Sequence, residues 1–292
     1  MDKPRTDPDV IILLLNWNGW RDTVKCLNSL KGLDYPSFQV VVVDNASTDN
    51  SLAQIRAAFP SLVIIEAGRN LGFAGGCNLG IKFALREEAQ YVWLLNNDTE
   101  VDPQSLRGLV ETAEADPDIG AVGSAIYSMT SPEQLQAWGG GYVNFWLGRS
   151  GHFTVPVDDE RLHFISGASL LIPRRAVESL GLLDECFFMY WEDADYCFRL
   201  RRAGWRLAVA AESKIWHKEQ GSVGKNTVLL DGFFNRSATR FFARHAPMPF
   251  ISIWSGMGLR ILKRVILCDW KRVRAVWRSA DFFEGSVIGK GS

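Results

Sequence analysis

Short apolar runs alternate with amphipathic segments along the first 125 residues of the chain. The runs at 9–16, 38–45, 62–68, 91–96 and 119–127 are apolar almost throughout and rich in Val, Ile and Leu. Strands of this kind are buried on both faces, which is typical of a parallel sheet covered by helices on each side. The pattern therefore predicts an α/β fold with a mostly parallel central sheet.

Helical spacing fills the intervals between these strands. It predicts helices at 20–32, 47–59, 74–86 and 103–116. Ser47, Thr48 and Asp49 are candidates to cap the second helix, because their side-chain oxygens can accept hydrogen bonds from its first free N–H groups.

Beyond residue 127 the alternation weakens and then resumes. Residues 130–165 are rich in glycine and aromatic side chains and are expected to form loops over a cleft. Residues 163–181 predict a strand and then a helix, and residues 189–210 predict a helix, a glycine stop and a strand. Because no linker or repeat interrupts the chain up to about residue 230, residues 1–230 are expected to form one domain.

Polar residues collect at the carboxyl ends of the predicted strands. They are Asn16 and Asn18, Asp44 and Asn45, Arg69 and Asn70, and the run from Asn96 to Glu100. Open parallel sheets bind ligands outside the carboxyl ends of their strands. Four such clusters at one edge therefore predict a binding site there.

The cluster "NNDTE" that follows the fourth strand contains candidate metal ligands. In an extended segment the spacing of Asn96 and Asp98 puts both side chains on one face. Oxygen donors so placed can hold Mg²⁺ or Mn²⁺ and leave positions for phosphate oxygens. A polar turn closed by side-chain hydrogen bonds is the alternative, and this motif alone does not decide between them.

Two segments between the first and fourth strands suggest nucleotide contacts. Asp44 can accept hydrogen bonds from a ribose or a pyrimidine N–H, although helix capping is the simpler role. The glycines of "GRNLGFAGGCNLG" (68–80) would let the chain approach a ligand. Neither the GxGxxG nor the GxxxxGK[ST] spacing is present, so this segment is not a Rossmann fingerprint or a P-loop.

The segment "FFMYWEDADYCFRLRRAGW" (187–205) places acids after a run of aromatics. Acids at a helix start are favoured by the helix dipole, which is the simpler explanation. A carboxylate beside an aromatic wall is also partly desolvated, which raises its pKa toward that of a general base. Glu192 and Asp193 cannot face the same way on a helix, so one base is expected. Arg199, Arg201 and Arg202 either pair with acids one turn away or are solvated.

Composition narrows the class of partner. The 292 residues include 47% hydrophobic and 22% charged residues with a net charge of −1, so no basic footprint for nucleic acid is present. Five cysteines without a CxxC pair indicate neither a disulfide framework nor a zinc site, and a reduced, cytoplasmic setting is the simpler reading. No apolar run reaches about 18 residues, so neither a signal peptide nor a membrane span is expected.

The C-terminal segment 254–278 has a different pattern. Apolar residues, tryptophans among them, recur at helical steps, and seven Lys or Arg residues accompany one acid between Arg260 and Arg278. A basic amphipathic helix suits the surface of an anionic membrane, and packing on the preceding domain is the alternative. Residues 244–250, "RHAPMPF", are the expected linker.

Taken in order, the motifs resemble those of glycosyltransferase family 2, the inverting sugar transferases of GT-A fold, and in particular its bacterial rhamnosyltransferase-like branch. They are "LNWNGW", "VVVDNASTDNS", "NLGFAGGCNLG", "LLNNDTEVDP", "SGASLLIPRRAVESLGLLDE", "YWEDADYCFRLRRAGW" and "WHKEQGS". The resemblance covers about residues 10–224. It implies a GT-A catalytic domain over 1–230, with a nucleotide-sugar half over 1–125 and an acceptor half over 126–230, followed by a helical segment over 231–292.

The resemblance also implies roles for single residues. Asp193 matches the family's catalytic base, and Asp98, with Asn96 and His217, would hold Mg²⁺ or Mn²⁺. From the residues alone, a structural role is the more common one for a lone histidine, and the position of His217 directly after the last strand keeps the ligand role open. The nucleotide-sugar site would comprise Asn16, Asp44, Arg69, Asn78, Asn97, Gly167, Ala168 and Glu192. Asn96 departs from the family, since many members carry an Asp there, and a neutral amide weakens the negative charge at the metal.

The activity so implied is the inverting transfer of a sugar, with L-rhamnose from dTDP-L-rhamnose as the expected donor and a UDP-sugar as the other choice. The acceptor would be a hydroxyl of a glycan or of a polyprenyl-diphosphate-linked glycan, reached by a protein lying on the inner face of the cell membrane. Whether the chain forms a homodimer is left open. Two alternatives are a nucleotidyltransferase, which usually carries a basic glycine-rich loop where this chain has "NWNGW", and a non-catalytic nucleotide-sugar-binding scaffold.

Overall fold

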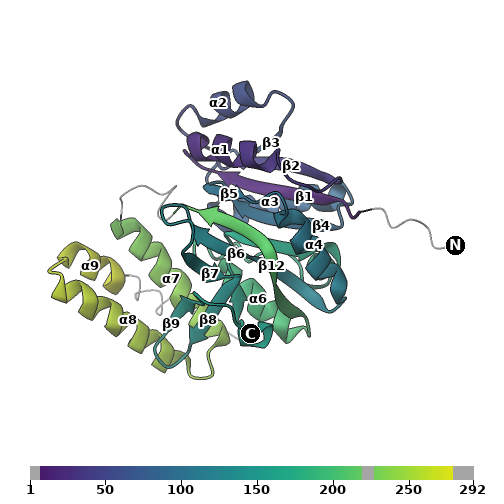
Figure 1. Ribbon diagram of the computed structural model, residues 1–292. Helices are drawn as coiled ribbons and strands as arrows, with labels where there is room; N and C mark the ends of the chain where they lie inside the picture. Colours follow the sequence, from purple (N-terminus) through teal and green to yellow (C-terminus); the bar gives the residue numbers. More distant parts are fainter. Residues whose placement is uncertain (1–6, 219–226, 279–292) are drawn as a thin grey trace, which may run out of the picture.

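The computed structural model describes residues 7–218 and 227–278. Its centre is a nine-stranded sheet with the strand order β3-β2-β1-β4-β11-β6-β12-β5, in which β7 pairs with β6 at the side (Figure 1). The strands are β1 (Val10–Asn16), β2 (Phe38–Asp44), β3 (Val63–Glu66), β4 (Tyr91–Asn96), β5 (Thr99–Val101), β6 (Ile119–Ser128), β7 (Leu135–Trp138), β11 (Ser169–Pro173) and β12 (Arg206–His217).

The sheet is mostly parallel, as the sequence predicts, with three exceptions, one of which is β7, antiparallel to β6. Strands β1, β2, β3 and β4 run parallel to one another, and β6 runs parallel to β12. Strand β11 runs antiparallel between β4 and β6, and β5 runs antiparallel to the end of β12.

Helices cover both faces of the sheet because successive strand residues point to opposite sides. Val10, Ile12 and Leu14 pack with α1 (Trp20–Leu30), α2 (Ser51–Ala58) and α4 (Ser105–Ala115). Ile11 and Leu13 pack on the other face with α3 (Gly72–Arg86), α5 (Arg174–Leu180) and α6 (Glu192–Arg202). Each fully buried Leu or Ile side chain contributes about 1.5–3 kcal/mol.

The start of helix α2 differs from the prediction. The helix begins at Ser51 after the N-cap residue Asn50, four residues later than expected. Ser47 and Thr48 are bound elsewhere: the N–H of Ser47 donates to Asp44 Oδ2 at 3.0 Å and that of Thr48 donates to Asn18 Oδ1 at 2.7 Å. The expected capping residues therefore hold the strand ends together, while Asp49 accepts from the N–H of Ser51.

Residues 130–165 form strands where loops were expected. Besides β7, they contain β8 (Gly140–Asn144), β9 (Arg149–His152) and β10 (Phe164–Ile165), and the last three make a small sheet in the order β10-β8-β9. The glycines misled the prediction because they serve close strand packing. A Cβ at Gly140 would overlap the Phe164 carbonyl, and one at Gly141 would overlap that of Gly151.

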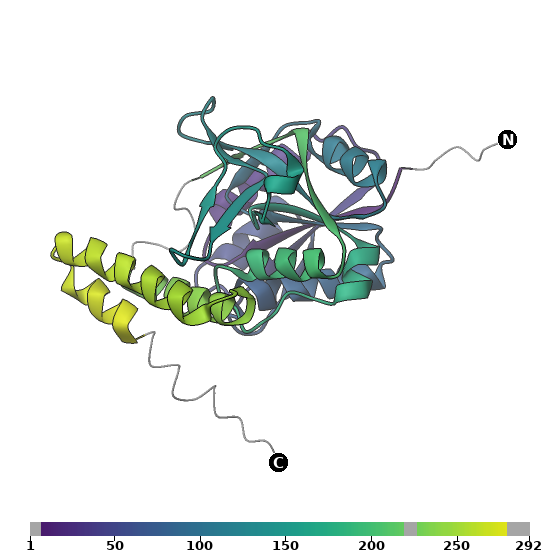
Figure 2. The ribbon, with the colours of Figure 1, turned by 90° about the horizontal axis from the view of Figure 1, so that it is seen from below.

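Three helices, α7 (Thr227–His245), α8 (Pro249–Ile266) and α9 (Trp270–Arg278), end the described chain. Figures 1 and 2 show α8 and α9 at the periphery, away from the central sheet. The expected boundary near residue 230 falls inside α7, and residues 279–292 lie outside the described chain.

The C-terminal prediction also needs correction in detail. Segment 254–278 is two helices separated by a turn at Leu267–Asp269, with Cys268 at a φ of 54°. The expected linker 244–250 is mostly helical, since Arg244 and His245 end α7 and Pro249 begins α8. Within residues 7–218 and 227–278, every helix is too short or too polar to cross a bilayer.

Candidate active site

A hydrogen-bond network joins the ends of β1 and β2. Asn16 Nδ2 donates to Asp44 Oδ1 at 2.8 Å and to Ser47 Oγ at 3.0 Å, and Asn16 Oδ1 accepts from the Thr23 hydroxyl at 2.8 Å. Asn97 Nδ2 donates to the same hydroxyl at 2.8 Å. The structure therefore brings Asn16, Asp44 and Asn97 together. Thr23 completes the network, and no pattern in the sequence singled it out.

Asp44 is the acid of this network and is only 4% exposed. Its carboxylate accepts hydrogen bonds from Asn16 and from the hydroxyl and N–H of Ser47. A carboxylate has about four lone-pair positions, so these bonds leave capacity for a ligand. The expected role in binding ribose or base stays a prediction, and the network explains how Asp44 is oriented.

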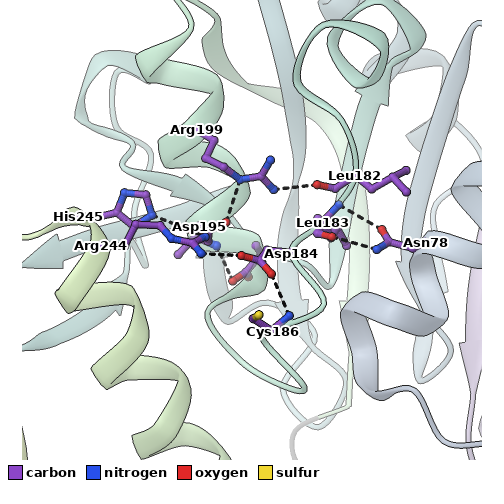
Figure 3. Close-up of polar contacts among 11 residues, drawn as sticks. Asn78, Leu182, Leu183, Asp184, Cys186, Asp195, Arg199, Arg244 and His245 are labelled. Carbon is purple, nitrogen blue, oxygen red and sulfur yellow. Dashed lines mark hydrogen bonds and ion pairs between the residues drawn. The ribbon is translucent and has the colours of Figure 1, made fainter. Parts of the chain in front are cut away.

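Arg69 and Asn78 are not part of the network. Arg69 is exposed beyond the end of β3. Asn78 Nδ2 donates to the Leu183 carbonyl at 2.9 Å and to Glu185 Oε1 at 3.0 Å, and its Oδ1 accepts from the Leu183 N–H at 3.1 Å (Figure 3). Both ends of the amide therefore hold α3 to the loop before α6, which corrects the expected place of Asn78 in the nucleotide pocket.

The glycines of 68–80 likewise serve packing more than ligand approach. Side chains at Gly76 and Gly80 would overlap Leu15 and Leu13, so α3 lies directly on β1. Gly72 has a φ of +74°, and a Cβ there would overlap the Phe188 carbonyl. This close approach brings the loop before α6 against the start of α3.

The expected metal ligands meet at the turn between β4 and β5. Asn96 ends β4, Asp98 follows in the turn, and His217 ends β12 beside Thr99 of β5. His217 Nε2 lies 3.3 Å from Asp98 Oδ1 and 3.3 Å from the Asn96 amide nitrogen. The segment is a turn, closed by the Thr99 hydroxyl on the Asn96 carbonyl at 2.7 Å, and it still presents both side chains to one histidine.

These three side chains fit a divalent cation. Two ligands at right angles and about 2.1 Å from a metal lie about 3 Å apart, which is close to the spacing of Asp98 Oδ1 and His217 Nε2. Rotating the Asn96 amide by half a turn presents its oxygen to the same point. No group of three or more His, Cys, Asp or Glu side chains that could hold a metal occurs in the described part of the chain. The three side chains therefore suit a cation such as Mg²⁺, which is commonly held by few protein ligands together with the phosphates of a substrate.

Gly167 and Ala168 connect this cluster to Asp193. The Ala168 carbonyl accepts from the Asn96 N–H at 3.0 Å, and the Gly167 N–H donates to Asp193 Oδ2 at 2.9 Å. The turn between β10 and β11 therefore lies between the candidate metal site and the candidate base. The expected role of Gly167 and Ala168 in the nucleotide-sugar site stays a prediction.

The surroundings of Asp193, the candidate base, raise its pKa. It is half-buried in the first turn of α6, and Oδ1 accepts from the Ala194 N–H at 2.7 Å. Burial raises the pKa of Asp193, while the hydrogen bonds from Gly167 and Ala194 and the charge of His152 act in the opposite direction. A raised pKa makes a carboxylate a stronger proton acceptor near neutral pH.

Glu192 points elsewhere, as expected for consecutive residues of a helix. It is 6% exposed, and Oε2 has no hydrogen-bond partner in the structure. Burial and then the charge of Asp193 raise the pKa of Glu192 well above its ordinary value. The carboxyl is therefore neutral over a wider pH range than Asp193 and is available as a hydrogen-bond donor.

The helix that carries both acids starts from a strained backbone. Tyr190 and Trp191 have φ values of 66° and 69°, in the left-handed region that costs non-glycine residues about 1–3 kcal/mol each. Packing offsets this cost, because the Trp191 ring lies 4.7 Å from that of Phe241 and 5.1 Å from that of Phe242, both on α7. Packing of these aromatic side chains against α7 therefore fixes the position at which α6 begins.

A cavity of about 340 Å³ lies beside the turn at Gly167 and reaches His217 of the candidate metal cluster. It is lined by Ile126, Gln136, Ala137, His152, Ser166, Ala168 and His217. Ser166 and Ala168 flank Gly167, which is bonded to Asp193. Sequence reasoning missed His152, Gln136 and Ser166, because they lie in or next to the segment that looked irregular.

Asp195, the third acid of the motif, has a structural environment. Its fully buried carboxylate accepts from Arg199 at 2.9 Å, from Arg244 at 2.8 Å and from His245 at 2.7 Å (Figure 3). Arg199 lies one helical turn away, as the sequence suggested, whereas the other two come from α7. Burial acts to raise the pKa of Asp195, but the hydrogen bonds from His245 and Arg199 outweigh it and the pKa is lowered.

Asp195→Ala is expected to lower the free energy of unfolding by about 3–5 kcal/mol, because it removes the buried carboxylate that accepts from Arg199, Arg244 and the fully buried His245. Because folding lowers the pKa of Asp195, the contribution of its carboxylate to stability is complete at pH values above the unfolded pKa of about 3.9. It is lost as the pH falls through the folded pKa. Urea unfolding at neutral and acidic pH measures both effects. Glu66→Ala, which removes the exposed pair with Arg56, is the control and should cost under about 1 kcal/mol.

Comparison with known proteins places this geometry in a family. The family model described as "Glycosyl transferase family 2" matches residues 9–181, more than half of the chain. An N-acetylglucosaminyl-diphospho-decaprenol L-rhamnosyltransferase of Mycobacterium tuberculosis is 28% identical over 232 residues, which are 71% of this chain and 75% of that protein. The low-salt glycan biosynthesis hexosyltransferase Agl10 of Haloferax volcanii is 28% identical over 66% of this chain, which spans 62% of its length.

Solved structures agree in fold. GalNAc-T7 with UDP, GalNAc and Mn²⁺ has a TM-score of 0.67 at 16% identity, over 85% of this chain and 50% of that one. The mannosyltransferase PcManGT from Pyrobaculum calidifontis with GDP-Man and Mn²⁺ has a TM-score of 0.60 at 18% identity, over 98% of this chain and 77% of that one. The central sheet with helices on both faces is thus the GT-A fold. By its sequence and its fold, the chain belongs to glycosyltransferase family 2.

Proposed function

We propose that the protein is an inverting, metal-dependent glycosyltransferase of cell-surface glycan or polysaccharide synthesis. It moves a sugar from a nucleotide-sugar to a hydroxyl of a glycan or of a polyprenyl-diphosphate-linked glycan. L-Rhamnose from dTDP-L-rhamnose is the proposed donor sugar, which rests on the motif pattern and on the mycobacterial relative. The proposed place of action is the inner face of the cell membrane.

One observation carries the proposal. The turn at Gly167 and Ala168 is hydrogen-bonded to Asp193 on one side and to Asn96 on the other, and a cavity lies against it. A base and a site for a diphosphate-bound cation, held near each other by one turn that borders a cavity, are what displacement at an anomeric carbon requires. A scaffold that only bound nucleotide-sugars would need neither a buried base nor this spacing.

The roles of the chain's residues follow from their chemistry. Asp193 accepts the proton of the acceptor hydroxyl, and the oxygen attacks the anomeric carbon on the side opposite the nucleotide diphosphate. The bond to the diphosphate breaks, and the single displacement inverts the configuration. Asp98, Asn96 and His217 would hold Mg²⁺ or Mn²⁺, which neutralises charge on the departing diphosphate when bound. The Gly167 N–H orients the base.

The donor is tested with purified protein and a set of nucleotide-sugars. Thermal unfolding and donor hydrolysis are measured with dTDP-L-rhamnose, UDP-glucose, UDP-galactose, UDP-N-acetylglucosamine and GDP-mannose, each with Mn²⁺ or Mg²⁺ and again with EDTA. A bound donor at about 100 times its Kd stabilises the fold by about 2.7 kcal/mol, so the correct one should raise Tm only when metal is present.

Each outcome of this screen decides something. Metal-dependent stabilisation by dTDP-L-rhamnose supports the proposal, and stabilisation by another donor keeps the enzyme class but rejects rhamnose. Release of pyrophosphate from a nucleoside triphosphate and a sugar phosphate would favour a nucleotidyltransferase. No response to any donor would reject the proposed site.

A further inference from the structure

Helix α8 buries Ile253 and Met257 against the protein but presents a further set of large apolar side chains to the outside. Trp254, Leu262 and Ile266 are exposed by 54%, 55% and 71%, whereas Ser252 and Arg264 are buried. The outer face of a helix on a soluble domain usually carries charged and polar residues instead. Eleven of the sixteen exposed large apolar residues in the described chain lie between Met248 and Trp277. A concentration of this kind marks an interaction surface.

The inward side of α8 is held by ionic and polar contacts. Asp231 of α7 accepts from Arg264 Nε at 2.7 Å and from Arg272 of α9. The Arg260 guanidinium donates to the Gly148 carbonyl at 3.1 Å and lies 5.7 Å from the centroid of the Phe234 ring. Rotating the helix to bury its apolar face would break these contacts, so the outward face belongs to the folded state.

The turn between β8 and β9 adds a further tryptophan beside α8. Ser255 Oγ donates to the Trp146 carbonyl at 2.6 Å, and a Cβ at Gly148, which has a φ of +55°, would overlap the Ser252 carbonyl. The turn is therefore seated directly on α8, and Trp146 is 67% exposed there. We call Trp146, Trp254, Leu262, Ile266 and Trp270 the apolar ridge.

The charges around the apolar ridge indicate what covers it. Lys263, Lys271, Arg274 and Arg278 are exposed, and Asp269 is the single acid between residues 249 and 278. A two-fold dimer through the ridge would bring these like charges together. An anionic lipid surface attracts them instead, and tryptophan favours the boundary between headgroups and acyl chains.

We propose that the apolar ridge is a docking surface that enters the headgroup region of an anionic phospholipid bilayer, with α8 and the Trp146 turn entering together. The sequence pattern alone indicated a single amphipathic helix. The structure adds the Trp146 turn and the inward ion pairs that keep the face exposed.

Docking at the bilayer also determines where an acceptor sugar would reach the cavity, and this inference rests on the proposed function. Strand β9 begins at Arg149, directly after the docking turn, and ends at His152 in the cavity beside Asp193. Six residues of chain from Trp146 to His152 span at most about 20 Å. A sugar carried on a bilayer-anchored diphosphate therefore meets the cavity close to the membrane surface.

The test is sedimentation of the full chain with vesicles in the absence of donor. Vesicles of phosphatidylcholine with phosphatidylglycerol are compared with pure phosphatidylcholine, at low and high salt. The double variant Trp254→Glu/Leu262→Glu should bind the anionic vesicles about tenfold or more weakly, because both side chains leave the apolar phase. Val155→Glu, at a 61% exposed site outside the ridge, is the matched control and should bind as the natural chain does.

Two further measurements keep the outcomes separate. Quenching of tryptophan emission by brominated phosphatidylglycerol tests insertion of the unaltered chain, and donor-induced thermal shifts of each variant report its fold and its nucleotide-sugar site. No binding of the natural chain to anionic vesicles overturns the docking inference, and a retained donor shift would leave the proposed function standing. A dimer that the double variant abolishes, without vesicle binding, would make the ridge a contact between copies and likewise overturn it.

Discussion

Asp193→Asn is expected to lower the rate of sugar transfer by about 10²–10⁴ while Tm and donor affinity stay close to those of the natural protein. The amide cannot take the acceptor proton, yet its oxygen can still accept the hydrogen bond from the Gly167 N–H. Single-turnover transfer measures the loss, and a donor-induced thermal shift checks the binding site.

The pH dependence of the same step has a defined sign. The base works when deprotonated, and burial raises the pKa of Asp193. The rate should therefore rise with pH through a value above the usual range for Asp, which is about 3.9 in model peptides. A rate independent of pH across the acidic limb would argue against Asp193 as the base.

The neighbouring acids give the contrast that makes this test specific. Asp195 is bonded to Arg199, Arg244 and His245, so its loss should lower stability first and activity only as a consequence. A stable Asp193→Asn protein with undiminished transfer would reject the mechanism and favour a non-catalytic nucleotide-sugar-binding role.

Asp98→Ala is expected to remove the metal dependence of donor binding and to lower transfer by about 100-fold or more, since a metal contributes several kcal/mol to stabilising a leaving group. Asp98 Oδ1 lies 3.3 Å from His217 Nε2, so the variant takes the carboxylate from the pair. Calorimetric titration of donor with Mn²⁺ and with EDTA measures the effect. If donor binding to the variant responds to EDTA as it does in the natural protein, the assignment of Asp98 as a metal ligand is wrong.

Asn96 offers a matched change in the opposite direction. Asn96→Asp adds a second carboxylate beside His217 without changing the shape of the side chain. Mn²⁺ should then bind more tightly in the absence of nucleotide, because the natural amide carries no charge to attract the ion. Titration with Mn²⁺ alone tests this, and unchanged affinity would place the metal elsewhere.

Much of the fold could be predicted because local sequence and the tertiary contacts agree. The apolar strands and the helices between them are visible as patterns, and all five predicted strands of the first 125 residues lie in the central sheet. The strand-end residues Asn16, Asp44 and Asn96 were visible for the same reason, since parallel strands bring their carboxyl ends to one edge. His217 lies beside Asn96 and Asp98 only because β12 runs beside β5.

The errors arise where one residue type serves two purposes. Gly140 and Gly141 resemble loop residues in sequence but allow strands to approach closely, and Ser47 resembles a helix cap but bonds Asp44. Asn78 is a polar residue of the kind that lines nucleotide pockets. Only its hydrogen bonds to the Leu183 backbone show that its amide is used for packing.

By itself, the sequence determined the α/β order and the edge of the sheet where polar residues gather, and it indicated Asp98 and Asp193 as candidate site residues, because these depend on periodicity and on chemistry at strand and helix ends. Only the tertiary structure decided that Asp195 holds α7 to α6, that His152 lines the cavity, and that α8 presents its apolar face outward. Each of these depends on segments distant in sequence, and local patterns carry no information on which distant partner a side chain meets.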